Sequence, residues 1–518
     1  MKLAVALVSI LGGVTLVAAA RGVAESPARG TTAADSRDVA VATAGVAPAR
    51  AVSAARTAAM SRSVRALDLD VNYVLTSRVR GGHWGAIVVS LTRGDTLFTR
   101  SADALMQPAS TLKLFTTGLA LDRFGPSYQI TTDVLRDGEM ESNGTLKGNL
   151  YLRGSGDPAM SMRFFGSADM PMDNLARAIA LTGLRHVTGD LVADASAFDG
   201  ERIPDGWKRR YLAAAYAAPV SALSLNENVL WVAVSPGRAH ADIALEPATT
   251  AYRITNNVTL RPGRRDARIV VYRGSDGDLD VRGWIGTKTS TKRYSVVVND
   301  PPRFAAGALR ASLAALGITV DGELREGVTP ATAHTVASFE SPPLAKIVSE
   351  MNRESINHVA ELLFRDAARA SAPDHVGSVA AGETALHNFL TTKVDVPAGD
   401  VRVSDGSGLS VRDSVTPRAL VHLLSYAHHS SWSSAFHSSL PVAGESELLK
   451  GRMRRTAAQG NLHAKTGTTN TVASLAGYVT AEDGEILAFA FIYNGADRWN
   501  ARAAMDRTGA LLAGFSRN

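Results

Sequence analysis

Alternating β-type runs mark both ends of the folded part of the chain. The segment HWGAIVVSLTRGDTLFTR, residues 83–100, holds two such runs around a Gly-Asp turn, which is typical of a β-hairpin. Three more runs follow near the C-terminus, beginning at about His463 and continuing through SLAGYVTA and EILAFAFIYNG. We expect these five strands to pair into one antiparallel sheet with helices on its faces.

Helical spacing of apolar residues appears next to both groups of strands. STLKLFTTGLALDRFG, residues 110–125, follows Pro108, and helices return in PPLAKIVSEMNRESINHVAELLFRDAARA, residues 342–370. The long stretch between them consists of short β-type runs separated by Gly, Asp and Asn, with few strong helices. The pattern predicts an α+β fold. One domain is formed by residues 63–128 and 335–518, and β-rich domains, one or two nested, are inserted as residues 129–334.

The N-terminal residues differ from the rest. Residues 1–20 combine a basic start, an apolar run and an A-x-A pattern at Ala18 and Ala20, which predicts a secretory signal. A retained anchor is the weaker alternative, because the apolar run is shorter than the roughly 20 residues of a membrane span. Residues 21–62, rich in Ala, Ser, Thr and Arg, are expected to form a disordered tether. No other segment predicts a transmembrane helix.

Composition excludes several classes of function. The formal net charge of +6 comes largely from scattered arginines, without the dense basic block that nucleic-acid binding favours. The absence of cysteine removes disulfides, metal thiolates and a cysteine nucleophile. The twelve histidines form neither H-x-H nor H-E-x-x-H, so we expect no metal site and no cofactor.

Three short motifs carry candidate chemistry. Ser110 and Lys113 lie three residues apart at a helix start, where they share one face and the lysine can serve as the base for a serine nucleophile. This S-x-x-K spacing is a weak signal alone. Ser355 and Asn357 form an S-x-N motif between two helical runs, and K-T-G-T begins at Lys465 at the start of a strand.

In this order, the three motifs resemble the active site of penicillin-binding proteins and serine β-lactamases. The sequence is similar to the D-alanyl-D-alanine carboxypeptidase/endopeptidases of the penicillin-binding protein 4 class, peptidase family S13. That family also carries extra domains between the first two motifs, which here are 245 positions apart. Further similar segments are GSGDP, APVSALSLNENV, DGSGLS and LAGYV. The resemblance implies a serine β-lactamase/DD-peptidase-like domain.

The resemblance also implies a role for each motif residue. Ser110 attacks the D-Ala-D-Ala peptide bond and becomes acylated, while Lys113 takes its proton. Ser355 passes a proton to the leaving amine, and Asn357 holds the substrate amide and the base. Lys465 supplies positive potential.

The rest of the K-T-G-T motif would bind the other end of the substrate. The hydroxyls of Thr466 and Thr468 would hold the terminal carboxylate, with Gly467 between them. The backbone N–H groups of Ser110 and Thr468 would form the oxyanion hole, commonly worth ~3 kcal/mol per donor. The implied substrates are peptidoglycan stem peptides ending in D-Ala-D-Ala, with β-lactams as inhibitors and an exported, periplasmic or extracytoplasmic location. The oligomeric state stays open.

The sequence departs from the family pattern at three places, of which Val411 and Lys208–Arg210 concern the recognition of substrate side chains. Ile356 occupies the middle of S-x-N, where many relatives have a polar residue. Val411 separates DGSGLS from Arg412. Relatives tend to place an acidic residue after a Trp at the position where Lys208–Arg210 follow Trp207, so recognition of a diaminopimelate amine is in doubt.

Two other functions remain as alternatives. A serine β-lactamase shares the three motifs, but no E-x-x-x-N of the deacylating type lies between Asn357 and Lys465, and the long insertion fits poorly. A non-catalytic module that binds wall polymer would not need all the motif residues intact. Hydrolysis of stem peptides, as carboxypeptidase, endopeptidase or both, is the leading hypothesis.

Overall fold

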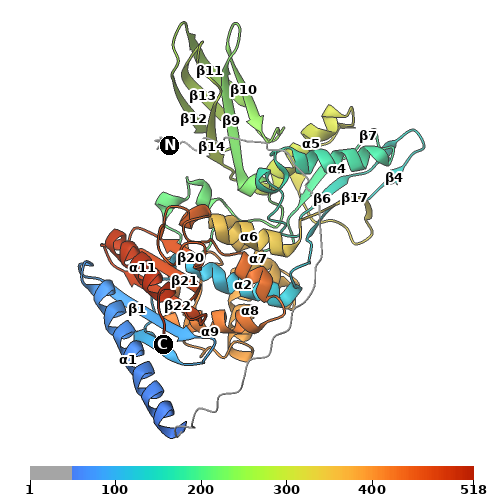
Figure 1. Cartoon of the computed structure of the whole chain (residues 1–518). Helices are drawn as coiled ribbons and strands as arrows, with labels where there is room; N and C mark the ends of the chain where they lie inside the picture. Colours follow the sequence, from blue (N-terminus) through green and yellow to red (C-terminus); the bar gives the residue numbers. More distant parts are fainter. Residues whose placement is uncertain (1–48, 518) are drawn as a thin grey trace, which may run out of the picture.

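The computed structural model describes residues 49–517, with side chains from residue 63 onward. The expected signal and most of the expected tether therefore lie outside the described residues. Figure 1 shows a sheet with helices on its faces, built from both ends of the chain, and a β-rich region that extends away from it. None of the helices between residues 49 and 517 combines the length and the hydropathy of a membrane span.

A five-stranded antiparallel sheet in the order β2-β1-β22-β21-β20 forms the centre of the first part. Strands from the two ends of the chain meet in it: β1 pairs with β22 from His83 opposite Asn494 to Ser90 opposite Leu487. The α+β fold class with an antiparallel sheet is thereby confirmed. The strands are β1 (His83–Ser90), β2 (Thr96–Arg100), β20 (His463–Thr468), β21 (Val472–Thr480) and β22 (Ile486–Asn494).

Alternation along the strands gives the sheet two different faces. In β22, Phe489 and Phe491 pack in a core with α1 (Ala49–Thr76) and α11 (Arg498–Ala513), whereas the small side chain of Ala490 faces the opposite core. A helix layer fills that second core and carries Lys113 and Asn357. Its helices are α2 (Lys113–Phe124), α6 (Leu344–Glu354), α7 (Asn357–Arg369), α8 (Val379–Thr392), α9 (Pro417–His429) and α10 (Ser433–Ser438).

Helix α1 corrects one prediction about the N-terminal region. It begins at Ala49 and thus includes residues 49–62, which were expected to belong to a disordered tether. Leu67, Val71 and Leu75 lie four residues apart and pack in the core beside the sheet. The docked turns provide a nucleus, and alanine, which loses no side-chain entropy in a helix, extends it toward the N-terminus.

Between α2 and α6 the chain forms a mixed sheet in the order β16-β8-β6-β3-β17, beside the small sheet β15-β7-β5-β4, with two longer helices against them. β17 pairs with β3, so residues 334–340 belong to this sheet, although position 335 was expected to begin the second half of the other domain. The elements are β3 (Thr131–Arg136), β4 (Glu139–Met140), β5 (Thr145–Lys147), β6 (Leu150–Arg153), α3 (Met162–Phe165), α4 (Met170–Leu181), β7 (His186–Val187), β8 (Leu191–Asp194), α5 (Pro301–Ala315), β15 (Thr319–Val320), β16 (Leu324–Glu326) and β17 (His334–Glu340).

A second β unit is nested between β8 and α5 and projects from the rest of the molecule (Figure 1). It consists of two three-stranded sheets, β10-β9-β14 and β11-β13-β12, and in the second sheet β11 and β13 are parallel. Buried Val232, Val258 and Val281 lie in a core shared by both sheets. The strands are β9 (Val229–Pro236), β10 (Ala241–Glu246), β11 (Ile254–Arg261), β12 (Ala267–Arg273), β13 (Leu279–Gly286) and β14 (Lys292–Val297).

Candidate active site

Ser110 lies in a 3₁₀ turn, Ala109–Leu112, that leads directly into α2. Ala109 has a φ of +49°, a conformation that residues with side chains rarely adopt. The carbonyl of Pro108 accepts a hydrogen bond of 2.6 Å from Ser474 Oγ on β21. The turn is thereby tied to the central sheet, and Ser110 remains partly exposed beside it.

Lys113 lies below Ser110 and is fully buried. Its Nζ is 3.1 Å from Ser110 Oγ and donates hydrogen bonds of 2.7 Å to Asn357 Oδ1 and to the backbone oxygen of Ser407. Burial disfavours the charged amine and lowers the pKa of Lys113 to about 8. With this pKa, roughly a tenth of the amine is neutral at pH 7 and able to accept a proton.

Three buried carboxyl groups, Asp405, Glu361 and Asp413, oppose this fall, because their negative charge favours the protonated form of Lys113. Burial, followed by repulsion from Asp405, raises the pKa of Glu361 to about 8. The same two causes raise the pKa of Asp413 well above its ordinary value. The amine of Lys113 thus lies near three carboxyl groups whose charge keeps its pKa from falling further than about 8.

The carboxylate of Asp405 accepts several hydrogen bonds, which fix its position. Its oxygens accept backbone hydrogen bonds from Ser407 (2.9 Å), Gly408 (2.6 Å) and Ser410 (2.7 Å). The indole Nε1 of Trp207 donates a further bond of 2.8 Å. The DGSGLS segment therefore folds as a loop around its own carboxylate, and this loop supplies the Ser407 carbonyl that binds Lys113.

Ser355 and Asn357 lie at the junction of α6 and α7. Ser355 ends α6 in the left-handed conformation, with φ of 59° and ψ of 43°, and Asn357 is the first residue of α7. Asn357 Nδ2 donates to the backbone oxygen of Tyr216 at 2.9 Å, while its Oδ1 faces Lys113. The side chain of Asn357 therefore connects the base to a segment of the inserted region.

Lys465 enters the site from β20. Its fully buried Nζ donates to Ser355 Oγ at 2.8 Å and to the backbone oxygen of Thr466 at 2.9 Å. Burial, followed by repulsion from Lys113, lowers the pKa of Lys465 well below its ordinary value. Two amines and two serine hydroxyls thus form two contacts, Lys113 with Ser110 and Lys465 with Ser355.

Gly467 brings β20 close to the nucleophile turn. A Cβ at this position would lie 2.8 Å from the carbonyl oxygen of Pro108 and 3.0 Å from the backbone nitrogen of Ser110, distances that a side chain does not tolerate. Thr466, just before it, is 8% exposed, and Thr468, just after it, is exposed. The edge strand therefore places Gly467 beside the turn that carries Ser110.

The structure brings the three motifs together. It also shows features to which the sequence interpretation gave no role. These are the three buried carboxyl groups near Lys113, the backbone carbonyl of Ser407 and the backbone carbonyl of Tyr216. DGSGLS is similar to a family segment, but the sequence alone assigned it no function. The burial of an isolated Glu or Asp has no periodic signal in a sequence, so these groups could not be found there.

A basic and aromatic segment borders the site. Tyr216, whose carbonyl binds Asn357, is 50% exposed and contacts the ring of Tyr211 edge-on, with centroids 5.8 Å apart. The guanidinium of Arg210 lies 5.3 Å from the Tyr211 ring centroid. The positively charged segment Lys208–Arg210 is thus linked through two tyrosines to a residue that contacts the base.

Arg412, which follows Val411 in the sequence, contacts the inserted region at Asp205. It forms an ion pair with Asp205, and both side chains are about 60% exposed. The backbone oxygen of Val411 accepts a 2.7 Å hydrogen bond from Gln107 Nε2.

Between residues 63 and 517, no group of three or more His, Asp or Glu side chains is placed to hold a metal ion.

The fold and the site, in which a buried lysine amine contacts a serine hydroxyl, are those of an active-serine enzyme of the acyl-transfer type. Residues 67–514 match the D-Ala-D-Ala carboxypeptidase 3 (S13) family. The D-alanyl-D-alanine carboxypeptidase of Actinomadura sp. (strain R39) is 31% identical over 465 residues, covering 86% of this chain and 84% of the relative. D-alanyl-D-alanine carboxypeptidase DacB of Haemophilus influenzae is 25% identical over 459 residues, covering 87% and 93%.

Fold comparison agrees with these relationships. The crystal structure of penicillin binding protein 4 from Haemophilus influenzae superposes with a TM-score of 0.70 at 24% identity, covering 84% of this chain and 98% of that one. The chain belongs to the S13 family. It is a serine hydrolase of the D-alanyl-D-alanine carboxypeptidase class, as the three motifs predicted.

Proposed function

We propose that this enzyme cleaves D-Ala-D-Ala and related DD-peptide bonds in peptidoglycan stem peptides through an acyl-enzyme on Ser110. One observation carries the proposal: a fully buried amine, that of Lys113, lies 3.1 Å from the Ser110 hydroxyl. Such contact is what a serine needs to become a nucleophile. β-Lactams, which present a reactive amide to the same serine, acylate and inhibit it.

In the first half-reaction, Ser110 Oγ attacks the carbonyl carbon of the penultimate D-Ala and its proton passes to Lys113 Nζ. The backbone N–H groups of Ser110 and Thr468 stabilise the oxyanion. When the peptide bond breaks, the proton that Lys113 took from Ser110 passes through Ser355, which contacts Lys465, to the leaving amine, so that Lys113 is neutral again. Water then attacks the Ser110 ester and gives a proton to Lys113, which returns it to Ser110 Oγ as the ester bond breaks, so that the acyl group leaves as a carboxylic acid and the serine is free.

Substrate binding is assigned to β20 and to the N-terminus of α7. The terminal carboxylate is bound by the hydroxyls of Thr466 and Thr468 in the positive potential of Lys465, because an anionic chain end is stabilised by a nearby cation. Gly467 keeps this strand close to Ser110. Asn357 binds the substrate amide. Carboxypeptidase and DD-endopeptidase reactions differ only in the group on the leaving side of the scissile bond.

The site of action is proposed to be outside the cytoplasm, in the periplasm or an equivalent compartment. Support comes from the signal-like composition of residues 1–20. The peptidoglycan substrate is located there as well.

Labelling with a fluorescent penicillin tests the assignment of the nucleophile. The wild-type protein should carry one adduct, which mass spectrometry of the proteolysed protein places on Ser110. Ser110→Ala should not be labelled and should release no D-Ala from a pentapeptide, whereas Ser434→Ala, an exposed serine on α10, should behave as wild type. An adduct that persists in Ser110→Ala would refute the assignment. Steady turnover of penicillin would instead indicate a β-lactamase.

A further inference from the structure

The projecting β unit carries most of the excess positive charge of the chain. Residues 229–298 contain eleven Lys and Arg against six Asp and Glu, a formal net charge of +5, whereas the whole chain has +6. Along the sequence four of them lie within residues 261–268, and the others are spread over the rest of the unit. The strands bring them together, because distant loops of a β unit meet at its ends.

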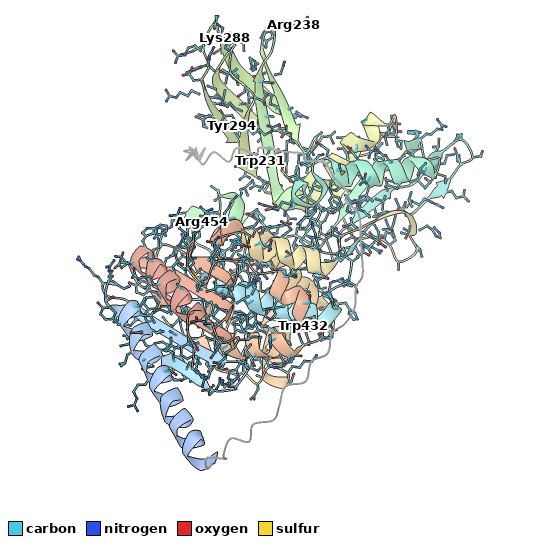
Figure 2. All side chains as sticks on the ribbon, viewed as in Figure 1. Trp231, Arg238, Lys288, Tyr294, Trp432 and Arg454 are labelled. Atoms are coloured by element: carbon cyan, nitrogen blue, oxygen red, sulfur yellow. The ribbon has the colours of Figure 1, made fainter. Side chains whose placement is uncertain are left out.

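The charges are separated along the length of the unit. β9, β11 and β13 run outward, so the loops that follow them meet at the far end. Figure 2 shows Arg238 and Lys288 at that end, with Trp231 nearer the rest of the molecule. Asp276 and Asp278 lie in the turn between β12 and β13, at the near end. The far end therefore carries an excess of positive charge, with Arg238, Arg264, Arg265 and Lys288 against Asp242 and Asp266.

An arginine cluster around one tryptophan forms the outer face of this end. Leu279, Val281 and Ile285 are buried, so Trp284, which alternates with them on β13, lies on the opposite face of the sheet. Arg268 on β12 is directly opposite Trp284 in the register.

The guanidinium of Arg261 lies 4.2 Å from the Trp284 ring centroid, and that of Arg264 lies 5.2 Å from it. We call five residues together the tip cluster: Arg261, Arg264, Arg265, Arg268 and Trp284. Arg265 belongs to it because it follows Arg264 in the same loop.

Most of this charge is not neutralised by the protein. All four arginines of the tip cluster are exposed. Arg264 pairs with Asp266 at 2.8 Å, and both side chains are more than half exposed. In the described part of the chain, Arg261, Arg265 and Arg268 take part in no ion pair. The stacking on Trp284 holds guanidinium groups in place, which reduces the entropy lost when they bind an anion.

We propose that the tip cluster is a docking surface for a polyanionic, phosphate-bearing polymer of the cell wall, distinct from the catalytic site. Guanidinium groups form paired hydrogen bonds with phosphate oxygens, and several on one face suit a repeating phosphodiester. The loops 237–240, 262–266 and 287–291 contain no exposed large apolar side chain, which a membrane-inserting tip would need. Choice of a wall polymer rests on the proposed extracytoplasmic function.

Such docking would hold the enzyme on the wall while leaving the active site free, because the cluster is at the far end of the projecting unit (Figure 2). Binding of this kind depends on charge and is screened by salt, since the interacting groups are exposed. Catalysis on short soluble peptides, which do not reach the tip, would be independent of it.

Co-sedimentation with isolated walls tests the docking. The probes are insoluble walls that retain phosphodiester polymer, the same walls stripped of it by acid, and vesicles of phosphatidylglycerol and phosphatidylcholine. The tip variant is Arg261→Gln/Arg265→Gln/Arg268→Gln. Its matched control, Arg65→Gln/Arg78→Gln/Arg80→Gln, removes the same charge from exposed arginines in and just after α1, at the opposite end of the molecule (Figure 1).

Wild type and the α1 control should sediment with polymer-bearing walls, and the tip variant should bind at least about tenfold more weakly at low salt. Stripping the walls should remove the difference between the variants. Penicillin labelling should be equal in all three proteins, which separates failure of docking from failure of the proposed function. Equal binding of the tip variant and the control to polymer-bearing walls would overturn the proposal, and so would wild-type binding that is as strong to stripped walls as to polymer-bearing walls. Tip-dependent binding to vesicles alone would assign the surface to membrane instead.

Discussion

The pH dependence of acylation gives a direct test of the lysine base. Burial lowers the pKa of Lys113 to about 8, and only the neutral amine can take the proton of Ser110. The acylation rate should therefore follow the neutral fraction, about 1% of its maximum at pH 6, about 9% at pH 7 and half at pH 8, with a plateau above pH 9. A solvent-exposed lysine would instead give a rate that still rises beyond pH 10.

The assay is the second-order rate constant of acylation by benzylpenicillin, followed by stopped-flow fluorescence between pH 5.5 and 10 at constant ionic strength. The carboxylate of this inhibitor stays ionised over the whole range, so it adds no titration of its own. The expected slope below the midpoint is about tenfold per pH unit. A profile that is flat from pH 6 to pH 9, or one without a plateau, would show that Lys113 is not the base.

Because the chain contains no cysteine, a chemical variant can assign the midpoint to one residue. In Lys113→Cys, alkylation of the unfolded protein with bromoethylamine restores an amine of the same length at this position alone. The sulfur lowers the intrinsic pKa of that amine, so the midpoint should move to lower pH after refolding. A midpoint that stays where it was in the wild type would mean that a different group titrates.

Three further variants test the position of the Ser110 turn, a buried ion pair that stabilises the fold, and the charge preference of the substrate site. In Gly467→Ala the new Cβ would collide with Ser474 Oγ and lie 2.8 Å from the Pro108 carbonyl oxygen, so the turn that carries the nucleophile must shift. Both the acylation rate, by at least about tenfold, and Tm should therefore fall. In Arg517→Ala the buried carboxylate of Glu485 loses its 2.8 Å partner, and urea unfolding should show a loss of about 3 kcal/mol. In Arg210→Glu, kcat/KM should shift toward peptides with an amine on the third side chain and away from those with a carboxylate, by about tenfold at low salt.

The parts of the fold that the sequence predicted are those with local signals. Alternating residues in 83–100 and 463–495 predicted the five strands of the central sheet, which the structure contains. Ser110 and Lys113 share a face because the turn and helix that carry them are local. Their contact with Asn357 and Ser407 required the family resemblance or the structure, since no periodic pattern connects residues so far apart.

Other elements were missed for physical reasons. Helix α5 begins with Asp300, whose side chain accepts from Arg303 N, followed by Pro301 and Pro302, all of them start signals. Its Ala- and Gly-rich sequence lies among strands and was interpreted as part of a β-rich stretch. The parallel pairing of β11 with β13 joins segments separated by another strand, and such register depends on packing between sheets.

The charge distribution is a case in which folding adds to what the linear order contains. Residues 261–268 already hold four arginines, whereas Arg238 and Lys288 lie twenty or more residues away on either side of them. Three outward strands place the loops of all three segments at one end (Figure 2). The concentration of positive charge at this end is therefore greater on the surface than in any one of these segments of the sequence.

The inserted region also contributes to the active site itself. Trp207 donates to Asp405, and the carbonyl of Tyr216 binds the amide of Asn357, so both supports of Lys113 are held by residues outside the central domain. Asp405 favours the charged amine, whereas burial disfavours it. The pKa of the base is thus set by a balance that depends on the position of this segment. An isolated central domain would keep its motifs but lose that balance, because water would replace the indole and the carbonyl. The insertion is therefore part of the catalytic structure rather than an appendage to it.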